Sequence, residues 1–231
     1  MIIGLAAGFA PVANAAPTVP VGPGTGWSTI PGVQLSPNAC TITALGHDNA
    51  GRLVALSAGH CWKSATGTYP GSAGLPIYKS TTGQQIGTLT SVHTWGGQPT
   101  VPQNTLDYQV IELDPNVVIP RSLSEDGTVS VTSFGTANLF QNLCKNGIGT
   151  GTTCGVVTQN SNPNYYKAFA AMNMGDSGSP AVKAGTGVLV GMGVGGDVNN
   201  AFTVGIFNKI QPILADINAQ GSYGAGFTLV P

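Results

Sequence analysis

Gly-Asp-Ser-Gly-Ser-Pro, residues 175–180, is the most informative stretch of this sequence. It places a serine in a turn flanked by glycines, where backbone N–H groups can converge because no Cβ obstructs them. Such a turn can hold an oxyanion, which is what acyl transfer at a serine requires. Asp, Ser and Gly also form ordinary turns, so the segment predicts catalysis only if the chain supplies a base.

The order of the titratable residues limits which base this can be. All three histidines precede Ser177: His47, His60 and His93. An α/β-hydrolase has its histidine after the serine, within a Gly-x-Ser-x-Gly turn, but here Ser179 takes the place of the second glycine. The subtilisin order would need Asp48, the sole carboxylate before His60, in an expected hairpin turn. The order histidine, aspartate, serine remains, with three possible middle members: Asp107, Asp114 and Asp126.

Short β-rich runs bounded by Gly, Asn or Pro recur from Cys40 onward and predict strands. They cover residues 41–45, 52–56, 86–90, 107–113, 129–134, 155–158, 181–183 and 188–194. Helical periodicity occurs at 207–217 and predicts a C-terminal helix with Pro212 near its first turn. The patterns favour an all-β sandwich or pair of barrels, with the connection between its halves at 115–124.

The composition excludes several classes of function. Charged residues are 7% of the 231 residues and the net charge is −1, so eight Lys and Arg cannot form the basic stripe that nucleic acid requires. The hydrophobic fraction of 42% and the length are sufficient for one large domain or two small ones.

The N-terminus predicts export. Residues 2–13 are apolar and lead into Ala-Asn-Ala at 13–15, which suits signal peptidase, so we expect a signal peptide over 1–15. The alternative is an apolar N-terminus without that role, because no basic residue precedes Arg52. Prolines and Asn14 interrupt this segment, so we expect no membrane span. Residues 16–32, rich in Pro and Gly, are expected to form an extended arm ahead of the folded part.

Four cysteines in an exported chain predict disulfides. Their spacing favours two local pairs, Cys40 with Cys61 and Cys144 with Cys154, each stabilising by about 3 kcal/mol. Buried free thiols are the alternative. No metal site is expected.

Three motifs, in this order, resemble those of the chymotrypsin-like serine peptidases. They are Ser-Ala-Gly-His-Cys at 57–61, Asp107 followed by a hydrophobic strand, and Gly-Asp-Ser-Gly at 175–178. The cysteine-bounded loop at 144–155 is similar to the second-barrel disulfide loop of secreted bacterial, streptogrisin-like members. The resemblance covers about residues 33–217, and the joint occurrence of the motifs is far more specific than any one alone.

The resemblance implies two antiparallel Greek-key β-barrels with the active site between them and a short C-terminal helix. The expected boundaries are 33–116 for the first barrel, 117–206 for the second and 207–231 for the helix and tail. It implies a secreted or extracellular serine endopeptidase that forms an acyl-enzyme on protein or peptide substrates. It implies neither a metal nor an organic cofactor, and we expect a monomer.

The resemblance also assigns roles to individual residues. His60 would take the proton of Ser177 and return it to the leaving amine, while Asp107 orients the imidazole. The N–H groups of Gly175 and Ser177 would receive the oxyanion. Asp176 would form an ion pair that holds this turn. Two basic residues could be its partner: Arg121 and Lys145.

The expected substrate pocket carries no charge. Its residues would be Ala171, Met172, Val194, Gly195 and Gly196. Ala171 stands where trypsin-like relatives have a carboxylate, and no histidine follows His93 to recognise glutamate, so cleavage after uncharged apolar residues is expected. Val194 replaces a serine that supports the catalytic aspartate in the family. A weak or inactive homologue that acts as an extracellular binding protein is therefore the first alternative, and an adhesive β-rich module is the second.

Overall fold

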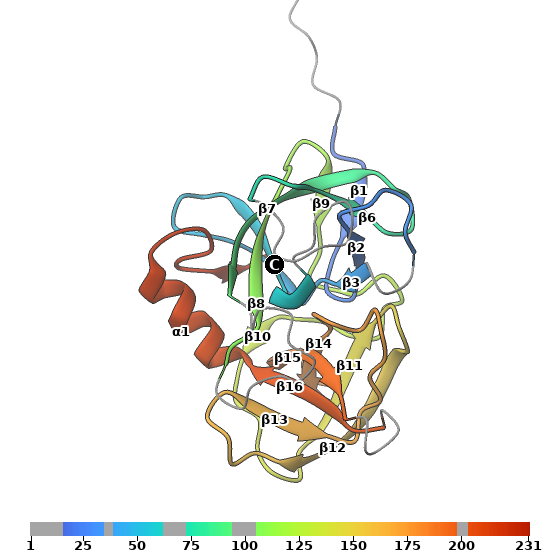
Figure 1. Ribbon diagram of the computed structural model, residues 1–231, viewed down its shortest axis with the longest axis vertical. Helices are drawn as coiled ribbons and strands as arrows, with labels where there is room; N and C mark the ends of the chain where they lie inside the picture. Colours follow the sequence, from blue (N-terminus) through green and yellow to red (C-terminus); the bar gives the residue numbers. More distant parts are fainter. Residues whose placement is uncertain (1–15, 35–38, 62–72, 94–104, 198–202) are drawn as a thin grey trace, which may run out of the picture.

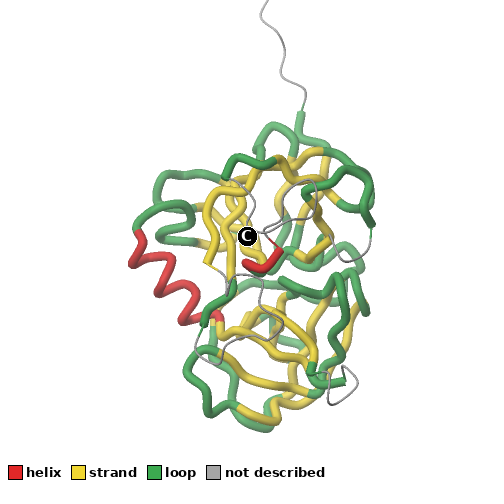
Figure 2. Tube along the Cα trace, in the orientation of Figure 1, coloured by secondary structure: helices red, strands yellow, loops and turns green. Residues whose placement is uncertain are grey.

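Short strands bounded by Gly, Pro and Asn make up most of this computed structural model, as the sequence predicts (Figures 1 and 2). The structure describes residues 16–34, 39–61, 73–93, 105–197 and 203–231. The expected signal peptide, 1–15, lies outside the described residues. Among the helices of the described part, none has the length and apolar character that crossing a membrane requires.

The first half is an eight-stranded antiparallel sheet in the order β17-β4-β5-β8-β7-β6-β2-β3. Its strands are β2 (Gly26–Ser28), β3 (Ala39–Thr41), β4 (Ala44–His47), β5 (Leu53–Ser57), β6 (Pro76–Lys79), β7 (Gln85–His93), β8 (Tyr108–Leu113) and β17 (Thr228–Leu229). Within the described residues its edge strands β3 and β17 do not pair with each other, so this half is a curved, open half-barrel sheet. It encloses fully buried side chains: Trp27, Leu56, Ile86, Leu89 and Ile111.

The second half is a closed six-stranded barrel, which lies below the first half in Figure 1. It closes because β15 pairs with both β14 and β16. Its strands are β11 (Asn142–Gly147), β12 (Gly151–Gln159), β13 (Tyr165–Ala168), β14 (Pro180–Lys183), β15 (Val188–Gly196) and β16 (Gly205–Lys209), and β10 (Ser133–Phe134) adds in parallel to β15. The prediction of an all-β double-barrel fold is confirmed.

Residues 16–32 do not form the extended arm that the sequence predicts. β1 (Val19–Val21) pairs in parallel with β9 (Val118–Pro120) of the connection between the halves, and β2 joins the first sheet. Val21 and Trp27 are buried because their apolar side chains fill the first core. The proline and glycines between Val21 and Trp27 predict turns, so the sequence pattern did not indicate these strands. Pro20 is tolerated in β1 because β1 is an edge strand.

The predicted C-terminal helix is present as α1 (Ile210–Gln220), and it begins three residues later than expected because Phe207 belongs to β16. Pro212 lies in the first turn, where backbone N–H groups have no partner within the helix. The helix buries Ile210, Ile213 and Ile217 and ends at Gly221, whose φ of 63° favours glycine. The chain then returns to the first half as β17, which pairs with β4.

Both predicted disulfides are confirmed. Cys40 of β3 is joined to Cys61, which ends the 3₁₀ turn η1 (Gly59–Cys61). Cys144 and Cys154 lie directly opposite each other on β11 and β12 and are joined there. The first bond therefore ties an edge strand to a turn, and the second links neighbouring strands of the closed barrel.

Candidate active site

His60 lies at a tethered corner between the two halves. The chain leaves β5 at Ser57 and turns through η1, in which the Cys61 N–H donates to the Ala58 carbonyl. The disulfide from Cys61 fixes the end of this turn. The imidazole is mostly buried, with 17% of the side chain exposed.

The structure brings together the three residues that the sequence predicts. His60 Nδ1 lies 2.6 Å from Asp107 Oδ2, and His60 Nε2 lies 2.6 Å from Ser177 Oγ. The main-chain N–H of His60 also donates to Asp107 Oδ1 at 2.7 Å. A carboxylate can only accept, so the ring proton belongs on Nδ1 and leaves Nε2 free to accept from the serine hydroxyl. The other two candidate carboxylates, Asp114 and Asp126, bind other groups, among them Asn116 and Asn146.

The turn that carries Ser177 leaves two N–H groups without an acceptor. The Ser177 carbonyl accepts from Thr41 N–H at 2.7 Å, and Gly178 N–H donates to the Gly193 carbonyl at 2.7 Å. The N–H groups of Gly175 and Ser177 donate to no group in the described part of the chain. Gly175 has a φ of 95°, a conformation that favours glycine. Both donors are thus free to bind an external oxygen atom.

Lys145 is the partner of Asp176, which answers the choice between Lys145 and Arg121. Lys145 Nζ lies 3.1 Å from Asp176 Oδ1, and both side chains are fully buried. Burial lowers the pKa of Lys145, while the negative charge of Asp176 opposes this shift. Arg121 is exposed at the surface.

The β11–β12 hairpin supplies most of the other contacts of the Asp176 carboxylate. Its Oδ1 accepts from the main-chain N–H groups of Gly149 and Thr150, at 2.9 and 3.1 Å. Its Oδ2 accepts from the Thr150 hydroxyl at 2.7 Å and from Asn173 N–H at 2.9 Å. The Asp176 carboxylate, in the residue before Ser177, therefore makes one ion pair and accepts four hydrogen bonds, which hold the turn in place.

Asn208 is a supporting residue that sequence reasoning missed. Val194 is buried and apolar, and the described residues give the Asp107 carboxylate two hydrogen bonds, both from His60. The main-chain N–H of Asp107 donates to Asn208 Oδ1 at 2.8 Å, and Asn208 is fully buried in β16. Its amide also donates to the Asn164 carbonyl at 3.3 Å. The only signal in the sequence is that Asn208 follows two apolar residues, and the predicted helix at 207–217 included it.

The five predicted pocket residues divide into two groups. Ala171, Gly195 and Gly196 are partly exposed, and a Cβ added at Gly195 would meet nothing within 4 Å. Met172 and Val194 are 1% and 3% exposed and pack in the hydrophobic cores. Only the first three are accessible to a substrate, and none of them carries a charge.

Comparison with known proteins accounts for this arrangement. The family model described as Trypsin matches residues 48–217 of the chain. The chain belongs to the trypsin family. It is therefore a serine endopeptidase by family, and the match spans the segments that carry His60, Asp107 and Ser177.

The trypsin-family chain is similar in fold to bacterial proteases. Thermobifida fusca protease A shares 19% identity, with 92% of this chain and 99% of that chain covered and a TM-score of 0.62. Cellulomonas bogoriensis chymotrypsin shares 20% identity over 91% and 98%, with a TM-score of 0.60. The Nocardiopsis protease shares 18% identity over 86% and 96%, with a TM-score of 0.61. No curated protein matches the chain in sequence.

Proposed function

We propose that the protein is an exported endopeptidase that cleaves peptide bonds after uncharged apolar residues with His60, Asp107 and Ser177. The observation that carries this proposal is the continuous pair of 2.6 Å contacts from Asp107 through the imidazole to the Ser177 hydroxyl. Three residues from distant parts of the chain meet in the geometry that proton transfer needs.

The first half of the reaction forms an acyl-enzyme. Ser177 Oγ attacks the substrate carbonyl while its proton passes to His60 Nε2, and Asp107 stabilises the imidazolium that results. The N–H groups of Gly175 and Ser177 bind the oxyanion, and each such donor lowers the barrier by about 3 kcal/mol. The imidazolium then gives its proton to the leaving amine, the C–N bond breaks, and the acyl group stays on Ser177 as an ester.

The second half repeats these steps with water. His60 removes a proton from the water, the resulting hydroxide attacks the ester, and the same two N–H groups bind the second oxyanion. The imidazolium returns its proton to Ser177 Oγ as the carboxylic acid leaves. Every proton that His60 takes is given back, so the cycle needs no cofactor.

The uncharged pocket supports the proposed preference. Ala171 gives a basic substrate side chain no carboxylate partner, and its carbonyl already accepts from the hydroxyls of Thr150 and Thr153 at 3.2 and 3.0 Å. Open space at Gly195 leaves room for a side chain. A cationic or anionic residue would lose its hydration there without compensation.

Two disulfides support an extracellular location, because such bonds persist in oxidising compartments. The alternative of an inactive homologue is less favoured, because the hydrogen bonds of the three residues are intact despite Val194.

The test combines a fluorophosphonate label with a peptide library. We expect wild type and the Ser222→Ala control, which alters an exposed serine, to be labelled and to cleave after Leu, Met, Phe or Ala. Ser177→Ala should remain folded and lose both properties. A folded wild type that takes no label contradicts the proposed mechanism, and cleavage mainly after Arg, Lys or Glu contradicts the proposed preference alone.

A further inference from the structure

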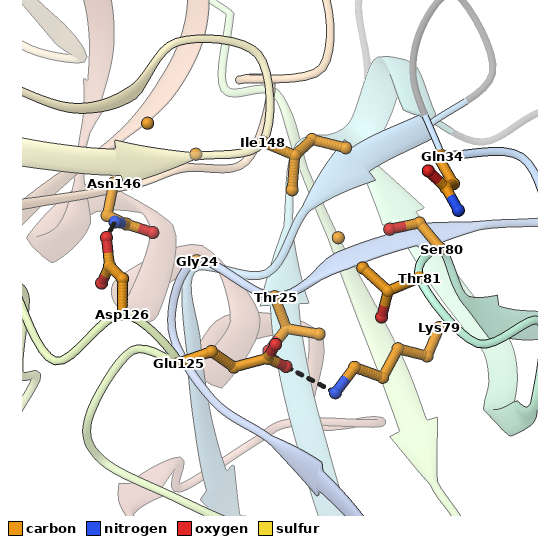
Figure 3. Close-up of a pocket in the computed structure, with 13 residues that line it drawn as sticks. Gly24, Thr25, Gln34, Lys79, Ser80, Thr81, Glu125, Asp126, Asn146 and Ile148 are labelled. Atoms are coloured by element: carbon orange, nitrogen blue, oxygen red, sulfur yellow. Dashed lines mark hydrogen bonds and ion pairs between the residues drawn. The ribbon is translucent and has the colours of Figure 1, made fainter.

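A cavity of about 400 Å³ lies where the N-terminal segment, the connection between the halves and the β11–β12 hairpin meet (Figure 3). Its lining includes Gly26, Ser80, Glu125, Asn146 and Ile148. The proposed triad and the five predicted pocket residues take no part in the lining. The cavity is therefore separate from the candidate active site, and its chemistry has no role in the proposed mechanism.

Two polar oxygen atoms at this cavity have no hydrogen-bond partner. Ser80 is 1% exposed and lines the cavity, yet its Oγ is bonded to nothing. The amide of Asn146 donates through Nδ2 to Asp126 Oδ2 at 2.7 Å, so its Oδ1 must point the other way, toward Gly24. Leaving a buried polar atom such as Ser80 Oγ without a partner is costly, so this cavity indicates a site built for a hydrogen-bonding group.

Two glycines leave room for these oxygen atoms. A Cβ added at Gly24 would lie 2.0 Å from Asn146 Oδ1, and one added at Gly26 would lie 2.3 Å from Ser80 Oγ and 2.8 Å from the Ile148 side chain. Any larger residue at either position would cover the oxygens. The space around the two oxygen atoms therefore depends on glycine at positions 24 and 26.

The charges around the cavity favour a cation. Lys79 Nζ is already bound to Glu125 Oε1 at 2.6 Å and to the Pro20 carbonyl at 2.9 Å, and its side chain is 6% exposed. The Glu125 side chain is 44% exposed. Partial desolvation raises the pKa of Asp126, but hydrogen bonds, led by that of the Ser124 hydroxyl, outweigh it and lower the pKa to about 2, so this residue is an anion. One lysine and two carboxylates line the cavity, which leaves a net negative charge beside the unpartnered oxygens.

We propose that this cavity is a binding site for a guanidinium group, supplied by an arginine side chain of a polypeptide or by a free guanidinium compound. A guanidinium carries five N–H donors in a fixed plane and accepts nothing, which suits a site whose unused oxygen atoms, an amide oxygen and a hydroxyl, can both accept. Asn146 Oδ1, Ser80 Oγ and the Glu125 carboxylate are the groups that receive its hydrogen bonds.

Agmatine, which is arginine without its α-carboxylate and keeps the guanidinium group, is the probe for this site. Titration into full-length Ser177→Ala, followed by amide NMR, should shift the resonances of the cavity residues with a dissociation constant on the order of 1 mM. Acetate at the same concentration should leave them unchanged. A folded protein that shows no shift with agmatine, shifts confined to the cleft near His60, or binding of acetate in place of agmatine would each overturn the proposal.

Two variants test the named acceptors. Adding Ser80→Ala should weaken agmatine binding about fivefold without loss of thermal stability, because it removes a hydroxyl that has no partner in the free protein. Glu125→Gln should weaken it about tenfold, and the Ser222→Ala control should not change it. Unchanged affinity in both variants overturns the proposal, and if Ser80→Ala fails to fold, Glu125→Gln alone decides.

The same titration identifies the source of the group. N-acetylated arginine peptide amide should bind more tightly than agmatine if the occupant is a polypeptide, and equally or less tightly if it is a free guanidinium compound. Both outcomes support a guanidinium site. Binding of neither probe overturns it, while the fluorophosphonate test of the proposed peptidase remains unaffected.

Discussion

The closed second barrel and the open first sheet hold their parts of the proposed triad in different ways. In the barrel, the buried ion pair between Lys145 and Asp176 lies beneath the turn of the nucleophile. In the first half, His60 is held by the neighbouring Cys40–Cys61 disulfide, and the sheet takes strands from both ends of the described chain. The closed half thus depends on buried charge, whereas the open half depends on links between distant segments.

Removing the buried cation should have the largest effect. Lys145→Met leaves the Asp176 carboxylate buried without a counter-charge, so the free energy of unfolding should fall by about 3–5 kcal/mol. The oxyanion turn should lose its support, and kcat/KM should fall by about 100-fold or more. Urea unfolding and peptide hydrolysis measure the two effects. Lys183→Met, at a partly exposed lysine of the same barrel, is the control; a Lys145→Met protein as stable and active as this control would contradict the contrast.

The two disulfides should differ more in their effect on catalysis than on stability. The cysteines are 21 and 10 residues apart, which predicts losses of about 3.4 and about 2.8 kcal/mol when each pair is changed to serine. Removing Cys40–Cys61 should also lower kcat about tenfold, because small displacements of His60 are costly. Thermal unfolding and kcat of the two double variants give the comparison. Equal losses of kcat in the two double variants would show that catalysis depends on the Cys40–Cys61 bond of the open half no more than on the Cys144–Cys154 bond of the closed barrel.

Asn208 joins the two halves, so its loss should affect both. Asn208→Ala leaves the buried N–H of Asp107 without an acceptor and should cost about 1–3 kcal/mol of stability. We expect kcat to fall about tenfold with KM unchanged, because the aspartate moves and the pocket does not. The control is Asn138→Ala at an exposed position. A rise in KM at constant kcat would instead place Asn208 in substrate binding.

Alkaline pH should weaken the second barrel's ion pair selectively. Burial lowers the pKa of Lys145 below its ordinary value of 10.5, so its positive charge is present below the lowered pKa and disappears as pH rises through it. Activity should therefore decline at a lower pH than titration of an exposed lysine would predict. Lys145→Arg should extend the active range upward, since arginine stays protonated. The pH dependence of kcat/KM for the two proteins tests this, and coincident alkaline limbs would exclude Lys145 as the titrating group.

The smallest expected effect is at the connection between the halves. The pKa of Asp126 is lowered from 3.8 to about 2 in the folded protein, so its stabilising contribution is complete above pH 3.8 and is lost as pH falls through about 2. Because the residue is exposed, the contribution should be about 1 kcal/mol or less. Asp126→Asn should flatten the pH dependence of Tm in this range, and an unchanged slope would contradict the assignment.

The sequence predicted the features that depend on residues close together in the chain, and it did not predict contacts between residues that the packing of the two halves brings together. The motif at 57–61 predicts a tethered His60, and the hairpin spacing predicts the Cys144–Cys154 bond, because both depend on near neighbours. Asn208 and Asp107 are 101 residues apart, and their contact depends on the register between β13, β15 and β16.

Glycine and proline residues are the reason why the sequence did not predict the strands β1 and β2. The strands β1 and β2 lie in a segment whose turn-forming residues predict an arm, and their burial depends on partners that local patterns do not name. Similarly, the sequence marked two candidate partners for Asp176, Arg121 and Lys145. Only the pairing of β11 with β12 and β14 decided between them.

The edge strand β17 has a consequence for the timing of biosynthesis. Thr228 pairs with His47, and the Val230 N–H donates to the Leu45 carbonyl, so β4 meets its outer neighbour only after nearly the whole described chain has been made. A nascent chain that stops before residue 228 carries every group of the proposed triad but leaves β4 as an unpaired edge. During synthesis, the half that leaves the ribosome first is thus the last to be completed.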